Sequence, residues 1–312
     1  MTNLEFLDMR RLTSLIVFLT APLVASSAHA TIGVDALGEA SWYLHVDFEE
    51  MKKGPAGTDV YAWFQAEIFD EIKKETGIDL GSKLEQLTAF GRTETDSVVV
   101  LEGNFPKDIE EKLMQGLQPE GVSKKSVAGK TYWQIGEQAY EGKKLKVELD
   151  KTDEVYVSFA LPKQIVAAFD KKKIEAVLKK GGVSPKGTPG PNALFVLSAE
   201  RNLLQAGANA DVLDEEANWD SKLVSNTKQV ALLVADSEGK LAIDAKLKAR
   251  KPEMAESMAN VIRGLIGLSY FSEDMEPGIA SLLRSTKVNV ADGILELSVV
   301  LDPKAFKDIV ED

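Results

Sequence analysis

The residues best suited to proton transfer lie together in the segment Ser41–Phe48 (SWYLHVDF). Its apolar residues recur at every second position, which predicts a strand whose face opposite the apolar one carries Tyr43, His45 and Asp47. An imidazole beside a carboxylate could act as a general base. A histidine that simply lies on the solvent-facing side of a strand gives the same pattern, and this second interpretation is the one we favour.

The composition excludes most other site chemistry. His29 and His45 are the two histidines and the chain has no cysteine, so a multi-histidine metal site, an H-E-x-x-H motif and thiol catalysis are all excluded. No G-x-S-x-G sequence supplies a nucleophile elbow. We therefore expect neither a metal nor a cofactor.

Acidic residues are abundant, which makes any pair of them uninformative. The densest segment is Asp211–Asp220 (DVLDEEANWD), and Glu273–Glu276 is a shorter one. Oxygen-rich loops can bind Ca²⁺, but the D-x-[DN]-x-[DN]-G spacing is absent, so both segments are interpreted as solvated loops. A glycosidase-type pair of carboxylates cannot be picked out of 49 acidic residues without geometry.

Aromatic side chains offer the other kind of candidate site. Trp63 lies off the apolar stripe expected on the neighbouring helix, and Trp133 stands beside Tyr132 in a strand, so one of that pair faces away from the core. Exposed Trp and Tyr commonly anchor proteins or sugars, although aromatics can equally cover the edge of a core. The candidate ligand-binding residues are therefore Trp63, Trp133, Tyr43 and His45.

The elements expected to carry these residues follow one repeated pattern, a strand followed by a proline and a helix. The prolines of the four copies are Pro106, Pro162, Pro252 and Pro303. Proline suits the first turn of a helix, where its missing N–H has no intrahelical partner, so Gln164–Phe169 is predicted to be helical. A further helix is expected from Val60, capped by Thr58 or Asp59 and stopped at Gly77. Other expected elements are a helix over Lys107–Leu117, strands over Leu84–Arg92, Ser97–Gly103, Lys130–Ile135, Lys144–Leu149 and Glu154–Ala160, and hairpins over Val230–Lys248 and Leu283–Leu301.

These copies indicate a duplication. Pro106 and Pro162 are 56 residues apart (162 − 106), and Pro252 and Pro303 are 51 apart (303 − 252). Lys179–Asn192 (KKGGVSPKGTPGPN) holds three prolines and four glycines and is interpreted as a linker. The predicted organisation is a signal peptide at 1–30, a first lobe at 31–180, a linker at 181–192 and a second lobe at 193–312. The predicted fold class is α+β, with two similar lobes that each form a mainly antiparallel sheet with helices on one face.

The N-terminus indicates export. Basic residues precede the apolar run Leu12–Val24, and Ala28-His29-Ala30 matches a small-x-small cleavage site. The predicted location is the periplasm or outside the cell, with translation starting at Met1 or Met9 and no membrane span left after the signal is removed. A formal net charge of −12 makes nucleic acid and anionic membranes poor partners.

Three stretches resemble a recurring pattern in uncharacterised exported bacterial proteins. They are Asp59–Gly91 (DVYAWFQAEIFDEIKKETGIDLGSKLEQLTAFG), Val98–Phe105 (VVVLEGNF) and Lys287–Phe306 (KVNVADGILELSVVLDPKAF). The resemblance implies export and a duplicated α+β domain, and those proteins have no assigned activity.

Three readings of function remain open from the sequence. The preferred one is an exported, non-enzymatic binding or scaffolding protein whose partner is an unknown protein or small molecule. The alternatives are a carboxylate-dependent periplasmic hydrolase and an assembly protein that self-associates. Two converging desolvated acids would favour the hydrolase, whereas an open apolar or aromatic surface would favour binding.

Overall fold

A computed structural model describes residues 40–93, 96–115, 117, 119–136, 139, 154–182, 192–200, 226–271 and 277–304. Several predictions made from the sequence concern residues outside these ranges. They are the signal segment, the strand Lys144–Leu149, most of the linker, the acidic segments Asp211–Asp220 and Glu273–Glu276, and all but the first residues of the helix after Pro303.

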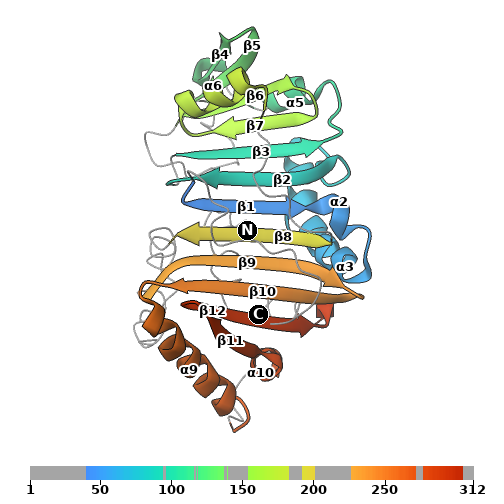
Figure 1. The fold of residues 1–312 in the computed structure, drawn as a ribbon. Coiled ribbons are helices and arrows are strands. Elements are labelled where there is room, and N and C mark those ends of the chain that lie inside the picture. The colour runs from blue at the N-terminus through green and yellow to red at the C-terminus, as the bar shows by residue number, and fades with distance from the viewer. Residues whose placement is uncertain are drawn as a thin grey trace, which may run out of the picture. The chain divides into compact units, whose positions relative to one another are not determined.

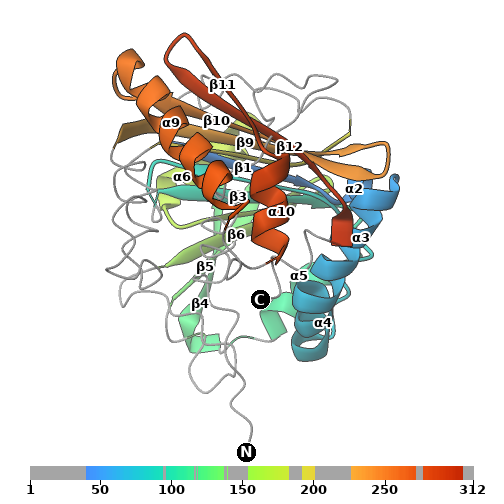
Figure 2. The ribbon, with the colours of Figure 1, turned by 90° about the horizontal axis from the view of Figure 1, so that it is seen from below.

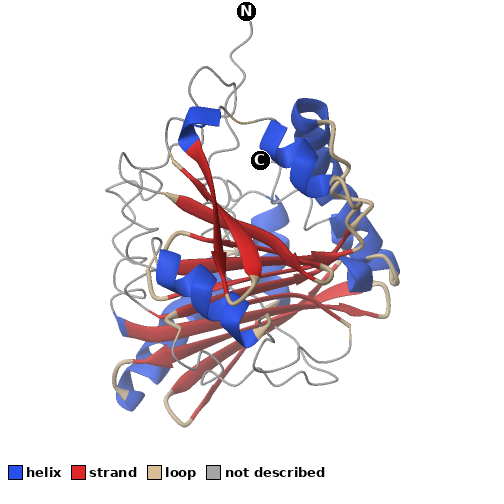
Figure 3. Ribbon diagram, turned by 90° about the horizontal axis from the view of Figure 1, so that it is seen from above, coloured by secondary structure: helices blue, strands red, loops and turns tan. Residues whose placement is uncertain are grey.

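The contacts within the chain divide it into two compact units, each described here by itself. For the described residues, the central unit is 64–182, and the split unit is 40–63 together with 192–304. Every strand pair whose register is defined is antiparallel, which confirms an α+β fold with a mainly antiparallel sheet. Figure 3 shows the strands and helices of the described residues. The prediction that the chain consists of two lobes with similar folds stays a prediction.

The central unit orders its strands β2-β3-β7-β6-β5-β4 (Figure 1). The strands are β2 (Leu84–Gly91), β3 (Ser97–Gly103), β4 (Val122–Val127), β5 (Lys130–Ile135), β6 (Val155–Leu161) and β7 (Gln164–Ala168). The helices are η1 (Gln65–Phe69), α4 (Asp70–Thr76), α5 (Ile109–Gln115), the short η2 (Pro119–Gly121) and α6 (Lys171–Lys180). Gly77 ends α4 in the left-handed conformation, with φ 72°, as the sequence predicts.

Both faces of the central unit's strands are covered. Side chains of β3, β6 and β7 alternate between two apolar clusters. One cluster contains Ile174, Val177 and Leu178 of α6, and the other contains Ile109 and Leu113 of α5. The expectation of helices on one face is therefore wrong for this unit, because β3, β6 and β7 carry apolar side chains on both sides and each side needs its own cover.

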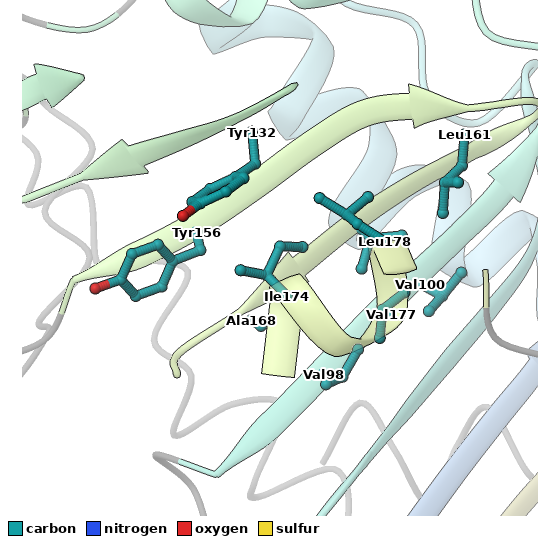
Figure 4. Packing of buried hydrophobic residues seen from close by; sticks show 10 residues of the cluster. Val98, Val100, Tyr132, Tyr156, Leu161, Ala168, Ile174, Val177 and Leu178 are labelled. Carbon is teal, nitrogen blue, oxygen red and sulfur yellow. The ribbon is translucent and has the colours of Figure 1, made fainter. Parts of the chain in front are cut away.

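The cluster beneath α6 includes two tyrosines whose hydroxyls are hydrogen-bonded (Figure 4). Tyr132 donates to Glu175 at 3.0 Å and Tyr156 donates to Glu154, while the two rings lie 6.2 Å apart. Burial and these carboxylates raise the pKa of both phenols. Each ring is thus buried without leaving its polar atom unpaired.

The segment Gln164–Phe169 is not the predicted helix. Gln164–Ala168 is strand β7, paired with β3 and, through a hairpin, with β6. The turn contains Lys163 at φ 58°, and the helix α6 begins only after Asp170, whose side chain caps it. Ile165 and Val166 are buried on opposite faces of the sheet, which only a strand allows for neighbouring residues. The free energy gained from this burial outweighs the local preference for a helix after Pro162.

The split unit orders its strands β11-β12-β10-β9-β8-β1 (Figure 1). The strands are β1 (Trp42–Asp47), β8 (Ala193–Glu200), β9 (Thr227–Ser237), β10 (Lys240–Ala249), β11 (Lys287–Ala291) and β12 (Ile294–Leu301). The helices are α2 (Phe48–Met51), α3 (Pro55–Phe64), α9 (Pro252–Leu268) and α10 (Pro277–Ser285). The β11–β12 hairpin turns at Asp292-Gly293, both with positive φ, as that dipeptide predicts.

The helix expected from Val60 starts five residues earlier, at Pro55. Asp236, near the end of β9, accepts a hydrogen bond from the Gly57 N–H at 3.1 Å and one from the Gly239 N–H at 3.0 Å. A carboxylate from 179 residues away thus satisfies the start of α3, and no local cap at Thr58 or Asp59 is needed.

The apolar stripe of this helical segment also differs from the expected four-residue spacing. Val60 and Phe64 are buried, but the next buried residue is Phe69 rather than Ile68. The π-helical turn η1 inserts an extra residue at this point and rotates the following side chains.

The helices α9 and α10 pack beside β11 and β12 (Figure 2). The buried side of α9 consists of Ala255, Met258, Ala259 and Ile262. The strand predicted from Leu283 begins only at Lys287, because Leu282 and Leu283 are buried as part of helix α10. Pro277 opens that helix, which the sequence analysis missed.

Candidate functional site

The Tyr43–His45 pair lies on β1, whose partner strand is β8. Tyr43 stands opposite Ser198 and His45 opposite Val196, and the two rings stack at 6.4 Å. His45 is 3% exposed, so the expectation of a solvent-facing histidine is wrong. Strand β8 is buried along nearly its whole length, whereas Tyr43 and Asp47, on the same face of β1 as His45, are half-buried.

Burial also determines the chemistry of this pair. It lowers the pKa of His45, with Asp47 opposing the shift, and it raises the pKa of Tyr43 to about 12. Both rings are therefore held neutral near pH 7. The Tyr43 hydroxyl and the Trp42 indole nitrogen are buried without a hydrogen-bond partner in the described part of the chain. An enclosed, neutral pair of this kind does not offer a reachable general base.

The two tryptophan candidates differ in their surroundings. Trp63 is half-buried in α3 and engages neighbouring groups. Trp133 of β5 faces away from the cluster that buries Tyr132, and its indole N–H donates to Glu110 of α5 at 2.9 Å. The Lys124 ammonium donates to the same oxygen at 3.3 Å and lies 4.8 Å from the centre of the Trp133 ring. The indole is thus already engaged through both its N–H and its π-face.

The four residues nominated from the sequence belong to two units of the chain, and Trp63 of α3 is in the same unit as Tyr43 and His45. Tyr43 and His45 meet on β1, in the split unit, and Trp133 belongs to the central unit. Among the described residues, no group of three or more histidine and acidic side chains is arranged to hold a metal ion.

A different set of residues forms the most exposed apolar surface among those described. At the end of α9, Leu268 is 61% exposed, Tyr270 60% and Phe271 86%. We call these three residues the apolar tip. Val261 and Ile279 are also exposed, on α9 and α10. Clustered exposed apolar side chains commonly mark a surface that another molecule covers.

A network of hydrogen bonds holds the apolar tip in place. Ser269 ends α9 and is fully buried, and its hydroxyl donates to the Ile266 carbonyl at 2.7 Å. The Ser269 carbonyl accepts two hydrogen bonds from the guanidinium of Arg284, which reaches across from α10. A cation at the carbonyl end of a helix is favoured by the helix dipole.

Arg284 also contacts the aromatic ring of Tyr270 in the apolar tip. Its guanidinium lies 5.3 Å from the centre of the Tyr270 ring. The Phe271 N–H donates to the Leu268 carbonyl at 2.9 Å, which closes the turn. The backbone that carries the three apolar side chains is therefore held in a hydrogen-bonded turn.

The sequence contains a signal for this surface that the search for aromatic anchors missed. Ala255, Met258 and Ile262 recur at helical spacing and define the buried stripe of α9. Leu268 falls off this stripe, and Tyr270-Phe271 follows beyond the last turn. Large apolar residues off the core stripe are the pattern that could have identified the tip.

Side-chain hydrogen bonds displace the pKa of four carboxyl groups among the described residues. The pKa is displaced for Asp79, Asp108, Glu154 and Glu296, and in each case side-chain hydrogen bonds lower it. A general acid in hydrolysis requires a raised pKa. None of these four carboxyls meets that requirement.

No protein-family model and no curated protein matches the chain. Solved structures of TP0453 are similar in chain path. Crystal form III has a TM-score of 0.47 and 10% identity, covering 90% of this chain and 99% of that chain. Crystal form I has a TM-score of 0.46 and 9% identity, covering 90% of this chain and 97% of that chain. Crystal form IV has a TM-score of 0.47 and 11% identity, covering 88% of this chain and 95% of that chain. Likeness at this level supports no inference about activity or partners.

No helix among the described residues is long and apolar enough to cross a membrane.

Proposed function

We propose that this chain is an exported binding or scaffolding protein that contacts its partner through the apolar tip and catalyses no reaction. The observation that carries the proposal is the presentation of Leu268, Tyr270 and Phe271 on a hydrogen-bonded turn. Placing a large apolar side chain in contact with a partner contributes roughly 1.5–3 kcal/mol when it becomes fully buried. Exposed aromatic anchors of this kind dominate the binding energy of many interfaces.

The wider setting of this proposal comes from the sequence. We retain the prediction of a signal peptide at 1–30 and of a mature chain in the periplasm or outside the cell. We also retain the prediction that the chain arose by duplication and contains two similar lobes. The partner is then a molecule of the same compartment.

Photo-crosslinking tests the proposal. A photoreactive phenylalanine analogue replaces Phe271 in cells that export the chain, and the matched control places it at Lys172, an exposed position of α6. The expected result is a discrete adduct from position 271 that is absent from position 172. Equal, diffuse labelling at both positions, or none at 271, would show that the apolar tip is not a binding surface.

A further inference from the structure

Strand β4 is the terminal strand of the central unit, and only one of its two edges has a partner among the described strands. It pairs with β5 from Val122↔Ile135 to Val127↔Lys130, and the order of strands ends with it (Figure 1). Its other edge, which we call the free edge, presents backbone N–H and C=O groups to which no described strand is paired. Such an edge can take up one more strand.

The turn of the β4–β5 hairpin shows which backbone groups point outward. Ala128 and Gly129 form a two-residue turn, and both have positive φ, at 49° and 75°. The two residues that flank such a turn form a hydrogen-bonded pair, and such pairs alternate with non-hydrogen-bonded pairs along the ladder. The N–H and C=O groups on the free edge therefore belong to Val122, Lys124 and Ser126.

Lysine is the only charged residue type on β4. Lys124 and Lys125 are exposed and, as neighbours in a strand, lie on opposite faces of the sheet. Lys124 forms an ion pair with Glu110 at 3.3 Å. Lys125 stands opposite Tyr132 in the register and forms no ion pair with a described residue. A carboxylate from a partner thus meets, at Lys125, an ammonium that no described carboxylate holds.

The neighbouring helix α6 adds positive charge beside this strand. It contacts β4, and Lys130 of β5 donates to the Leu178 carbonyl of α6 at 2.9 Å. Lys171 and Lys179 both lie near one carboxylate, that of Glu175, at 3.9 and 3.5 Å. One carboxylate cannot neutralise two ammonium groups, so this side of α6 keeps an excess of positive charge.

The region around β4 is therefore positive in an acidic chain. Hydrogen bonds from Tyr156 and Gln134, and then the charges of Lys125 and Lys171, lower the pKa of Glu154, which is the third glutamate of the region. Five lysines against three glutamates give a formal charge of +2 (5 − 3), whereas the whole chain carries −12. The residues counted are Lys124, Lys125, Lys130, Lys171, Lys179, Glu110, Glu154 and Glu175.

An extended acidic segment fits this edge better than two other occupants. The outward N–H and C=O groups need a partner that both accepts and donates at the spacing of a strand, which a phosphate group does not supply. A second copy of β4 sets lysine against lysine, and like charges on paired strands are destabilising. Lysine on an edge strand commonly prevents such self-pairing. Acidic side chains reverse the sign of the same interaction.

We propose that the free edge of β4 binds an extended acidic segment of a partner protein, which joins the sheet of the central unit as a further strand. The segment's backbone pairs with the outward groups of Val122, Lys124 and Ser126, and its carboxylates reach Lys125. The contact is small, so the complex is weak and transient. The apolar tip belongs to the split unit, so this inference does not rest on the proposed function.

Fluorescence anisotropy with a labelled synthetic peptide tests the inference. The probe is a short peptide that alternates glutamate and valine, titrated with the mature chain. The expected result is saturable binding that weakens as salt is added, because salt screens the attraction between carboxylate and ammonium. A peptide with lysine in place of glutamate should not bind. A copy methylated on its backbone nitrogens, which has lost its N–H donors, should not bind either.

Substitutions at Ser126 test the backbone contribution. Ser126→Pro removes an outward N–H but no N–H of the β4–β5 ladder, so the hairpin is kept. It should weaken the peptide about tenfold or more, because a hydrogen bond is lost and the ring obstructs the edge. Ser126→Ala keeps the N–H and is the matched control, with unchanged affinity. Thermal melting verifies that each variant folds.

Charge reversal tests the lysine contribution. Lys125→Glu should weaken the peptide about tenfold or more, because it places like charges across the new strand pair. Lys172→Glu makes the same change of charge at an exposed position of α6 outside the counted residues, and it should affect the affinity much less.

Three outcomes would overturn the proposal. Absence of saturable binding would mean that the lysines only protect the edge from pairing. Equal binding to Ser126→Pro, or equal binding of the methylated peptide, would show attraction between charges without strand addition. Binding of inorganic polyphosphate that is lost in Lys125→Glu, with no binding of the peptide, would assign the lysines to a general anion site. Crosslinking from residue 271 is independent of all three, so the proposed function stands or fails separately.

Discussion

Trp133 and the aromatic residues of the apolar tip differ in how far neighbouring side chains contact them. Around Trp133, Glu110 accepts the indole N–H and Lys124 lies over the ring, so neighbouring residues use both of its binding features. At the tip, Arg284 contacts the Tyr270 ring and the Ser269 carbonyl, and Phe271 is left 86% exposed. The first arrangement stabilises the fold, whereas the second leaves apolar surface exposed. Residue type alone does not distinguish them.

The largest contrast should appear when each aromatic is truncated. Trp133→Ala removes a half-buried ring and its hydrogen bond, and we expect a loss of roughly 2–4 kcal/mol in the free energy of unfolding. Phe271→Ala should change it by less than about 0.5 kcal/mol, because the ring contacts little. Urea unfolding of both variants measures the difference. Equal losses would mean that the tip is part of the core and not a binding surface.

Removing the partner of the indole is the next step. Glu110→Ala leaves the Trp133 N–H and the Lys124 ammonium without their shared acceptor, and we expect a loss of about 1 kcal/mol. The half-exposed Lys124 can still be solvated, which keeps the cost moderate. Glu111→Ala, on the next position of α5, is the control. A variant as stable as the parent would show that the Glu110 contacts contribute nothing.

His45 should make the stability of the chain depend on pH. Burial lowers its pKa in the folded state, so the unfolded chain binds the proton more readily. Stability is then fully present above the unfolded pKa of about 6.5 and falls as the pH decreases toward the folded value. We expect His45→Gln to flatten the stability profile between about pH 6.5 and pH 5, above the range in which carboxylates titrate. An unchanged slope in denaturant titrations would contradict the burial of the imidazole.

Removing the side chain of Arg284, which holds the turn of the apolar tip, should have a small effect on stability. Arg284→Ala removes the hydrogen bonds to the Ser269 carbonyl and the contact with Tyr270, at a cost of about 0.5–1 kcal/mol. The tip should then be less ordered, so crosslinking from residue 271 should fall more than stability does. Arg284→Lys keeps the charge but not the planar fork, and it should restore only part of the crosslinking. Full crosslinking in Arg284→Ala would show that the turn needs no clamp.

The sequence patterns succeeded where a few neighbouring residues decide the structure. The alternation in Ser41–Phe48 predicted β1, Gly77 predicted the end of α4, and Asp292-Gly293 predicted a hairpin. They failed where the competing structure has a distant partner. Pro162 suggested a helix, but pairing with β3 makes the following residues a strand.

The candidate site was predicted less well than the fold. Aromatic type nominated Trp133 and Tyr43, yet the one is engaged by Glu110 and the other is largely enclosed. The apolar tip lay in the sequence as large residues off the stripe of α9. Whether these residues are exposed depends on which face of α9 the strands cover. Periodicity identifies the buried face, but it does not show how much of the remaining face stays exposed.

By itself, the sequence determined the antiparallel α+β class, the start of α9 at Pro252, and the exclusion of cysteine and multi-histidine chemistry. Proline geometry, strand alternation and composition act locally, so they are visible without a fold. Only the tertiary structure decided that β1 pairs with β8, that His45 is buried there, and that Arg284 fixes the turn carrying Phe271. These outcomes depend on contacts between residues far apart in the chain, where burial and hydrogen bonding outweigh local preference.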